Sequence, residues 1–187
     1  MASHAVELVV TLRVTDNEAR SALEALQVKM GLQEAVRDLA RDDVWELTVD
    51  TSDEDEAVAL VTDLVRTTNL FANPNKHRTA IGLPGVAGTP LELDEVAVLV
   101  AERGSDEGTT IIETLTGLGV TAVSGARRWS RWRVRMAEPP REGDQALLAL
   151  VRRIAVTTGR TEGLLSNPHS ETSRAVFPWG GEVVLER

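Results

Sequence analysis

The chain of 187 residues contains no cysteine. Disulfide bonds, thiolate nucleophiles and zinc–cysteine clusters are therefore excluded, and the composition fits the reducing cytoplasm. Aromatic residues are scarce: four Trp, two Phe and no Tyr are too few for a base-stacking platform. No apolar run approaches the roughly 20 residues of a membrane helix. The start, Met1 to His4, has neither the basic nor the apolar region of a signal peptide.

An excess of basic residues is also missing. The formal net charge is -9, and residues 1–90 carry 8 basic and 15 acidic side chains against 12 and 14 in residues 91–187. A net acidic protein repels the phosphate backbone of nucleic acids unless it has a local basic patch. We therefore expect a cytoplasmic protein whose partner is neither a nucleic acid nor a membrane.

What the sequence does contain is one pattern that occurs twice. In each half, a strand with apolar residues at period two leads into an amphipathic helix, which ends at a glycine, and a second strand containing a tryptophan follows. At the first helix start we expect Thr15 to act as the cap and Glu18 to reach back. The repeated features are the strands 6–14 and 95–101, the helix starts Thr15 and Ser105, the glycines Gly31 and Gly119, and the tryptophans Trp45 and Trp132.

The repeat continues beyond the tryptophans. Residues 35–38 and 122–125 are interpreted as earlier arms of the same β segment, in a hairpin or a bent strand. A second amphipathic helix follows in each half, and after it comes a close echo with Asn-Pro at its end. The paired segments are the helices around 57–65 and 147–154, the echoes 70–74 and 164–168, and the last strands 79–83 and 182–185.

This order predicts an α+β protein of two tandem ferredoxin-like β-α-β-β-α units, each an antiparallel sheet with both helices on one face. We place the first copy at 1–81, a linker at 82–90 and the second copy at 91–187. The linker assignment follows from its glycines and prolines. Apolar residues on the outer strand faces indicate that the two sheets pack on each other as a pseudo-dimer; these are Val9, Val44 and Leu99.

Motifs that would carry chemistry are weak. The three histidines, His4, His77 and His169, have no second ligand at metal spacing. The acidic run 53–56 lacks the glycine of a calcium loop, and its place before a helix suits the macrodipole. The glycines of 82–88 lack the Gly-Lys-Ser/Thr of a phosphate-binding loop. We predict no catalytic residue, no metal site and no cofactor.

The most unusual segment is basic and runs from Arg127 to Arg135. Arg131, Arg133 and Arg135 are expected on one face of a strand, with Trp129 beside them in a loop. Three interpretations stay open: a solvated strand face, a contact surface for an acidic partner or for the acidic first copy, and a phosphate or nucleotide site.

The two echoes carry a family resemblance. Leu70-Phe71-Ala72-Asn73-Pro74 and Leu164-Leu165-Ser166-Asn167-Pro168, in this order of elements, resemble the helix-ending signature of PurS, the small subunit of phosphoribosylformylglycinamidine synthase. The segments 26–31 and 115–119 are similar to the Leu-x-x-Leu-Gly segment of that family. The chain departs from it where Gly-Lys would precede the second strand. At these places the chain has Arg41-Asp42-Asp43 and Arg128-Trp129-Ser130. A second departure is that two units are fused in one chain.

The resemblance implies a function. The family's complex converts formylglycinamide ribonucleotide to formylglycinamidine ribonucleotide with ATP and glutamine, and its small subunit bridges the glutaminase and synthetase subunits without an active site of its own. The implied partner-binding residues are those of the Asn-Pro turns and the basic segment: Asn73, Pro74, Asn167, Pro168, Trp129, Arg131, Arg133 and Arg135. A homo-oligomer also stays open. The alternative is a sensor module that binds an amino acid or a nucleotide between its two copies; a stand-alone enzyme is the least favoured reading.

Overall fold

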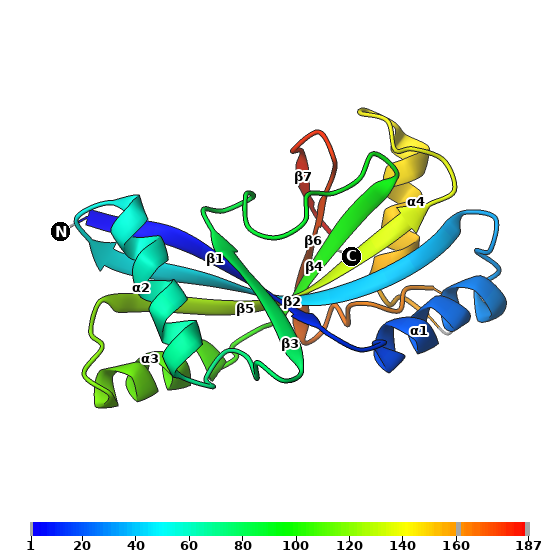
Figure 1. The fold of residues 1–187 in the computed structure, drawn as a ribbon. Coiled ribbons are helices and arrows are strands. Elements are labelled where there is room, and N and C mark those ends of the chain that lie inside the picture. The colour runs from blue at the N-terminus through cyan, green and yellow to red at the C-terminus, as the bar shows by residue number, and fades with distance from the viewer. Residues whose placement is uncertain (1, 160–161, 186–187) are drawn as a thin grey trace. The chain divides into compact units, whose positions relative to one another are not determined.

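In a computed structural model, residues 2–159 and 162–185 are described, and they form an α+β fold with one open antiparallel sheet (Figure 1). The strand order in the sheet is β3-β1-β2-β5-β4-β6-β7. The elements are β1 (Ala2–Leu12), α1 (Asn17–Glu24), the π-helical turn η1 (Ala25–Lys29), β2 (Val36–Thr51), α2 (Glu54–Thr67), β3 (His77–Gly82), β4 (Glu95–Glu102), α3 (Glu107–Gly117), β5 (Val123–Met136), α4 (Gln145–Ala155), β6 (Glu171–Val176) and β7 (Glu182–Val184).

The two expected double-armed β segments are single long strands. β2 has 16 residues and β5 has 14, so each copy begins with the order β-α-β-α and not with β-α-β-β-α. The hairpin alternative for 35–38 is therefore wrong. The physical reason is visible in the sequence, because residues 36–51 contain no Gly, Pro or Asn that would favour a tight turn.

The chain forms two compact units, and each unit contains segments from both sides of residues 82–90. Unit 1 comprises Met1–Val14, Asp42–Pro90 and Gly104–Trp129. Unit 2 comprises Thr15–Arg41, Leu91–Arg103 and Ser130–Arg187. The boundaries at 81 and 91 thus mark the sequence repeat and not the compact units. The first helix of the first copy belongs to unit 2, and the first helix of the second copy belongs to unit 1. β2 and β5 each have one part in unit 1 and the other in unit 2.

Unit 1 has one apolar core between its strands and two helices. Residues of β1 and β2 meet α2 from the first half of the chain and α3 from the second half. Both helices therefore cover the same face of these strands. The buried members are Val6, Leu8, Val10, Trp45, Leu47, Val49, Ala57, Val61, Leu64, Phe71, Ala72, Ile111, Leu115 and Val123.

Unit 2 has the corresponding core. Here α1 and η1 from the first half pack with α4 against β4 and β5. Leu26 of η1 is fully buried in this core. The buried members include Ala19, Leu26, Leu32, Val36, Val96, Val98, Val100, Trp132, Val134, Met136, Val151, Ile154 and Phe177.

The ends of the first helices are only partly as expected. The cap of α1 is Asp16 and not Thr15, because the Asp16 carboxylate accepts from the N–H groups of Glu18 and Ala19 at 2.9 and 3.2 Å. The glycine stops are confirmed. Gly31 and Gly119 have φ of 67° and 84°, the left-handed region in which a side chain would be strained.

The strand after the second echo is β6, at Glu171–Val176, where no strand was predicted. It pairs with β4 as β3 pairs with β1, so β6 is the counterpart of β3. The predicted last strand at 182–185 corresponds to β7, an additional partner of β6. The polar start of β6, Glu171-Thr-Ser-Arg, hid it from the period-two pattern.

The outer residue Val9 of unit 1 is covered by the chain's own segment 83–90, which has no helix or strand. A Cβ placed on Gly88, whose φ is +78°, would lie 3.1 Å from Val9, and Ala87 is buried. In unit 2, the outer residue Leu99 pairs directly with Arg131 and Arg174 on the neighbouring strands. Arginine stems cover apolar surface well. Val9 and Leu99 are thus buried without the second sheet that was expected to cover them.

Candidate functional site

The first Asn-Pro turn is held by four hydrogen bonds around Asn73. Its side-chain oxygen accepts from the N–H of Asn75 at 2.9 Å, and its carbonyl accepts from Lys76 and His77 at 2.9 and 2.8 Å. Its own N–H donates to Nδ1 of His77 at 3.0 Å. The result is a rigid turn in which Asn73 and Pro74 are exposed and from which β3 begins.

The second turn has the same bonds. The Asn167 side chain accepts from His169 at 3.1 Å, and its carbonyl accepts from Ser170 and Glu171 at 3.1 and 2.8 Å. The N–H of Asn167 donates to the Glu171 carboxylate at 2.5 Å. Asn167 is exposed and Pro168 is half-buried. Glu171 therefore takes the place of His77.

An arginine ties each turn to the end of the first strand of its copy. Arg13 donates through its backbone N–H to Lys76 and through Nε to the carbonyl of His77, both at 2.8 Å. Arg103 makes the same two bonds, at 2.8 Å each, to the carbonyls of Ser170 and Glu171. Neither Arg13 nor Arg103 was singled out from the sequence.

One large apolar residue before each Asn-Pro is a core anchor. Phe71 is 8% exposed and meets Trp45 edge-on, with the ring centroids 5.4 Å apart. Leu165, its counterpart, is 7% exposed in the core of unit 2. Phe71 and Leu165 thus fix each turn to the core and leave the Asn-Pro at the surface, whereas Leu164, which precedes Leu165, is 41% exposed.

The three arginines of the basic segment do share one strand face. Arg131, Arg133 and Arg135 are half-buried and alternate along β5 with buried Trp132, Val134 and Met136. Acidic side chains of the same unit lie close to two of them. Glu95 lies 3.8 Å from Arg133, and Arg135 lies within 4 Å of the carboxylates of Glu92, Asp94 and Glu95.

Arg133 and Arg135 thus face the acidic residues 92–95 of unit 2. The pKa of Arg135 is raised, chiefly by the charge of Glu92 and then by that of Asp94. Part of the basic character is therefore neutralised within unit 2.

Trp129 lies in β5 and not in a loop. It is 4% exposed, and its indole N–H donates to the Glu46 carboxylate at 2.9 Å. The guanidinium of Arg127 stacks on its ring at 4.1 Å from the centroid. Trp129 is thus a buried residue of unit 1, whereas Asn73, Pro74 and Asn167 are exposed.

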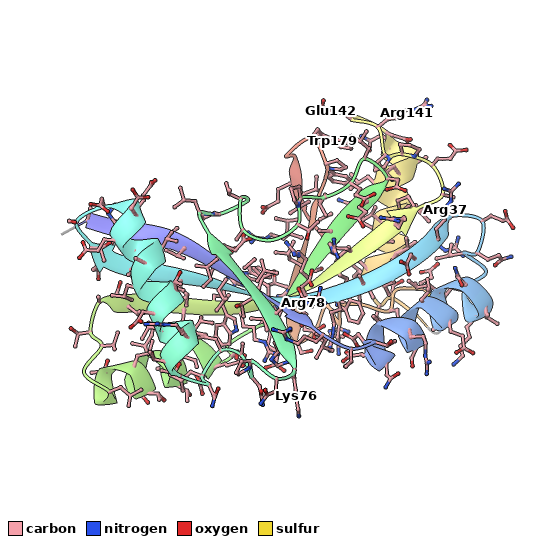
Figure 2. The ribbon with its side chains drawn as sticks, viewed as in Figure 1. Arg37, Lys76, Arg78, Arg141, Glu142 and Trp179 are labelled. Carbon is pink, nitrogen blue, oxygen red and sulfur yellow. The ribbon has the colours of Figure 1, made fainter. Side chains whose placement is uncertain are left out.

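Unit 1 also contains a cavity of about 440 Å³ that sequence reasoning missed. It lies at the first Asn-Pro turn, between α2 and β3, and Figure 2 labels Arg78 on β3 and Lys76 in the turn. Its lining residues are Arg13, Thr62, Val65, Arg66, Ala72, Pro74, His77, Arg78, Thr79 and Ile81. Three guanidinium groups and an imidazole in one hollow are chemistry for an anion.

The acidic run at the start of α2 is structural. Asp53 accepts from the N–H of Glu56 at 2.8 Å, and Glu56 accepts from the N–H and hydroxyl of Ser52 at 2.9 and 2.6 Å. The pKa of Asp53 is lowered chiefly by the backbone N–H of Glu56, and that of Glu56 chiefly by the Ser52 hydroxyl. Within the described ranges no three His or acidic side chains are grouped so that they could hold a metal ion.

None of the helices in the part of the chain that the structure describes has the length and apolarity to cross a membrane. No protein-family model matches the chain, and no curated protein matches it.

Proposed function

We propose that the chain is a bridging subunit of a phosphoribosylformylglycinamidine synthase, in which it joins the glutaminase and synthetase subunits and supplies no catalytic residue. In this proposal the chain is a cytoplasmic tandem of two ferredoxin-like units equivalent to a PurS dimer. The observation that carries it is the repeated Asn-Pro turn, whose sequence resembles the PurS signature and whose hydrogen bonds are the same around Asn73 and Asn167.

Two equivalent turns with different charges suit a bridge. The first turn presents Lys76 and leads into His77 and Arg78, whereas the second presents Ser170 and leads into Glu171 and Thr172. Charge complementarity directs each surface to a different partner and suppresses the wrong pairing. A basic turn and an acidic turn on one scaffold therefore favour two different partner subunits over two copies of one.

The test is co-elution on a sizing column with the glutaminase and synthetase of the same organism, in the presence of ADP, magnesium and glutamine. We expect one complex, and glutamine-dependent activity only when all three proteins are present. Separation of the chain from two large subunits that are active without it would refute the proposal.

Two surface variants make the test specific. Lys76→Glu reverses the charge of the residue that the first turn presents, and Ser170→Arg adds a positive charge to the second turn; neither side chain holds its turn together. Each is expected to release a different large subunit while the other still co-elutes. Arg37→Glu, at an exposed position of β2 in unit 2, is the matched control and is expected to leave the complex intact. Loss of both subunits in all three variants would point to general charge effects.

The second candidate is the sensor module, and the cavity of unit 1 is the observation that favours it. The sequence-based version of this hypothesis placed the ligand between the two copies. The cavity instead lies within unit 1. A ligand bound there is compatible with a bridging role of the chain, and the two functions are tested by separate experiments.

A further inference from the structure

We propose that unit 1 binds a small phosphorylated organic molecule, a phosphomonoester, in the cavity between α2 and β3. This goes beyond the bridging function, because it assigns a ligand to one copy of the repeat only. The cavity volume of about 440 Å³ is within the range of small-molecule sites, which is roughly 300–1,000 Å³.

The charge of the lining residues is opposite to that of the protein. Arg13, Arg66 and Arg78 line the hollow, and none of its described lining residues is acidic, although the chain carries a net charge of -9. Arg66 forms an ion pair with the carboxylate of Asp63 at 2.6 Å, and both side chains are mostly exposed. An exposed ion pair of this kind is weak, so a dianionic ligand can replace Asp63 as the partner of Arg66.

Arg13 is held in place before any ligand arrives. Its Nε donates to the carbonyl of His77 at 2.8 Å, which uses one of the five N–H donors of the guanidinium. The planar group is therefore fixed at the cavity wall with donors remaining. Pre-ordering of a guanidinium lowers the entropy cost of a bidentate contact with phosphate oxygens.

His77 has a defined donor as well. Its Nδ1 accepts from the N–H of Asn73 at 3.0 Å, so the neutral ring carries its proton on Nε2. The hydroxyl of Thr79, two residues along β3, adds a second neutral donor to the lining. Arg78 lines the hollow from β3, which is the edge strand of unit 1.

The rest of the wall is apolar. Val65 from α2, Ala72 and Pro74 from the turn, and Ile81 from β3 provide a surface for the organic part of a ligand. A wall that combines several cationic groups with four apolar side chains fits a phosphate ester better than free inorganic phosphate, which has no apolar part to bury.

Unit 2 has the same turn with different charges beside it. Arg103 is retained in the role of Arg13, but Glu171 and Thr172 follow the second turn where His77 and Arg78 follow the first. A carboxylate in place of the imidazole repels a phosphate. The second copy is therefore an internal negative control on the same fold.

The experiment is a calorimetric titration of the full chain, without the large subunits, with phenyl phosphate, inorganic phosphate, benzoate and benzyl alcohol. Phenyl phosphate is expected to bind saturably and tighter than inorganic phosphate and benzoate, and benzyl alcohol is expected not to bind. Absence of saturable binding of phenyl phosphate up to about 10 mM, a limit well above an ordinary weak dissociation constant of 1 mM, would overturn the proposal. Equal binding of benzyl alcohol would overturn it too.

Matched double variants locate the site. Arg66→Gln with Arg78→Gln removes two charges from the cavity, and a loss of affinity for phenyl phosphate of at least about tenfold is expected. Arg37→Gln with Arg141→Gln removes two exposed charges from unit 2 (Figure 2), and a change of less than about twofold is expected. Equal losses in both pairs would show non-specific attraction and refute a defined site.

An NMR titration of the unaltered chain is independent of how the variants fold. Phenyl phosphate is expected to shift the amide signals of His77 and Thr79 and to leave those of Glu171 and Ser173 in place. Shifts confined to unit 2 would contradict the assignment. A second result would also contradict the assignment: the unaltered chain does not bind phenyl phosphate, and the Arg66/Arg78 double variant loses a large subunit. The basic cavity would then be a contact surface for a protein.

Discussion

The backbone N–H of Asn73 donates to Nδ1 of His77, four residues later, at 3.0 Å, and the N–H of His77 donates back to the carbonyl of Asn73. In the second copy a carboxylate performs the imidazole's part, since Asn167 donates to Glu171 at 2.5 Å. The turn thus requires an acceptor four residues after the asparagine and does not require a particular residue type. This freedom leaves the charge beside each turn adjustable without loss of the turn.

The first prediction concerns this acceptor. His77→Ala removes it and is expected to lower the free energy of unfolding by about 0.5–1.5 kcal/mol, the net value of one hydrogen bond. His77→Glu supplies the acceptor found in the second copy and is expected to remain near the original stability. Urea unfolding followed by tryptophan fluorescence measures both. If His77→Glu lost as much as His77→Ala, the acceptor would not be what holds the turn.

The second prediction concerns two glycines of α3. A Cβ on Gly108 would lie 2.0 Å from the carbonyl oxygen of Ala126, so Gly108→Ala forces α3 away from β5 within unit 1. We expect a destabilisation of about 1–3 kcal/mol, as for overpacked cores. At Gly117 nothing lies within 4 Å of the added Cβ, and Gly117→Ala is expected to stabilise by about 0.5–1 kcal/mol through helix propensity. Thermal or urea unfolding that reversed this order would contradict the packing of α3.

The third prediction concerns the exchanged helices. A fragment of residues 91–187 retains β4 and α4 but lacks Leu26 and Val36, which are fully buried in the core of unit 2. We expect it to show no cooperative unfolding by circular dichroism when alone. Mixing it with residues 1–81 is expected to restore a cooperative transition, because α1 is then supplied again. Cooperative unfolding of the fragment 91–187 by itself would refute the exchange.

Within the full chain, Leu26→Ala is a milder version of this test. It opens a cavity in the core of unit 2 and is expected to cost about 2–5 kcal/mol. The exposed neighbour Val28→Ala is its control and should change the stability little. Similar costs for the two substitutions would place η1 outside the core.

The fourth prediction concerns acid pH. In the folded chain the pKa values of Asp53 and Glu56 are lowered by the hydrogen bonds at the start of α2. A folded pKa below the unfolded value stabilises the fold above the unfolded pKa, and this stabilisation is lost as the pH falls below about 4.5. Asp53→Asn and Glu56→Gln should therefore flatten the decline of unfolding free energy between about pH 5 and pH 3. An unchanged decline in urea titrations at several pH values would exclude these two groups as its source.

Local features were predictable because they depend on near neighbours in the chain. The glycine stops at Gly31 and Gly119 follow from backbone conformation, and the shared face of Arg131, Arg133 and Arg135 follows from strand periodicity. The cap of α1 was predicted at Thr15, one residue before the actual cap, Asp16. Both residue types are good caps, and only geometry selects between them.

The candidate site was predictable in part. The exposure of Asn73 and Asn167 follows from turn chemistry. Trp129 was placed in a loop because its partner, Glu46, is 83 residues away and no local pattern indicates the bond between them. The basic cavity combines Arg13 with Arg66 and Arg78, which are separated along the chain and come together only when β3 pairs with β1.

The sequence by itself determined the repeat, the α+β class, the period of each element and the two Asn-Pro turns, since these depend on residue spacing and local backbone preference. Only the tertiary structure decided that α1 joins the core of unit 2 and α3 that of unit 1, and that segment 83–90 covers Val9. The physical reason is that two copies of one unit have nearly identical apolar faces. A helix stripe specifies that it must be buried, but not which of two similar cores will bury it.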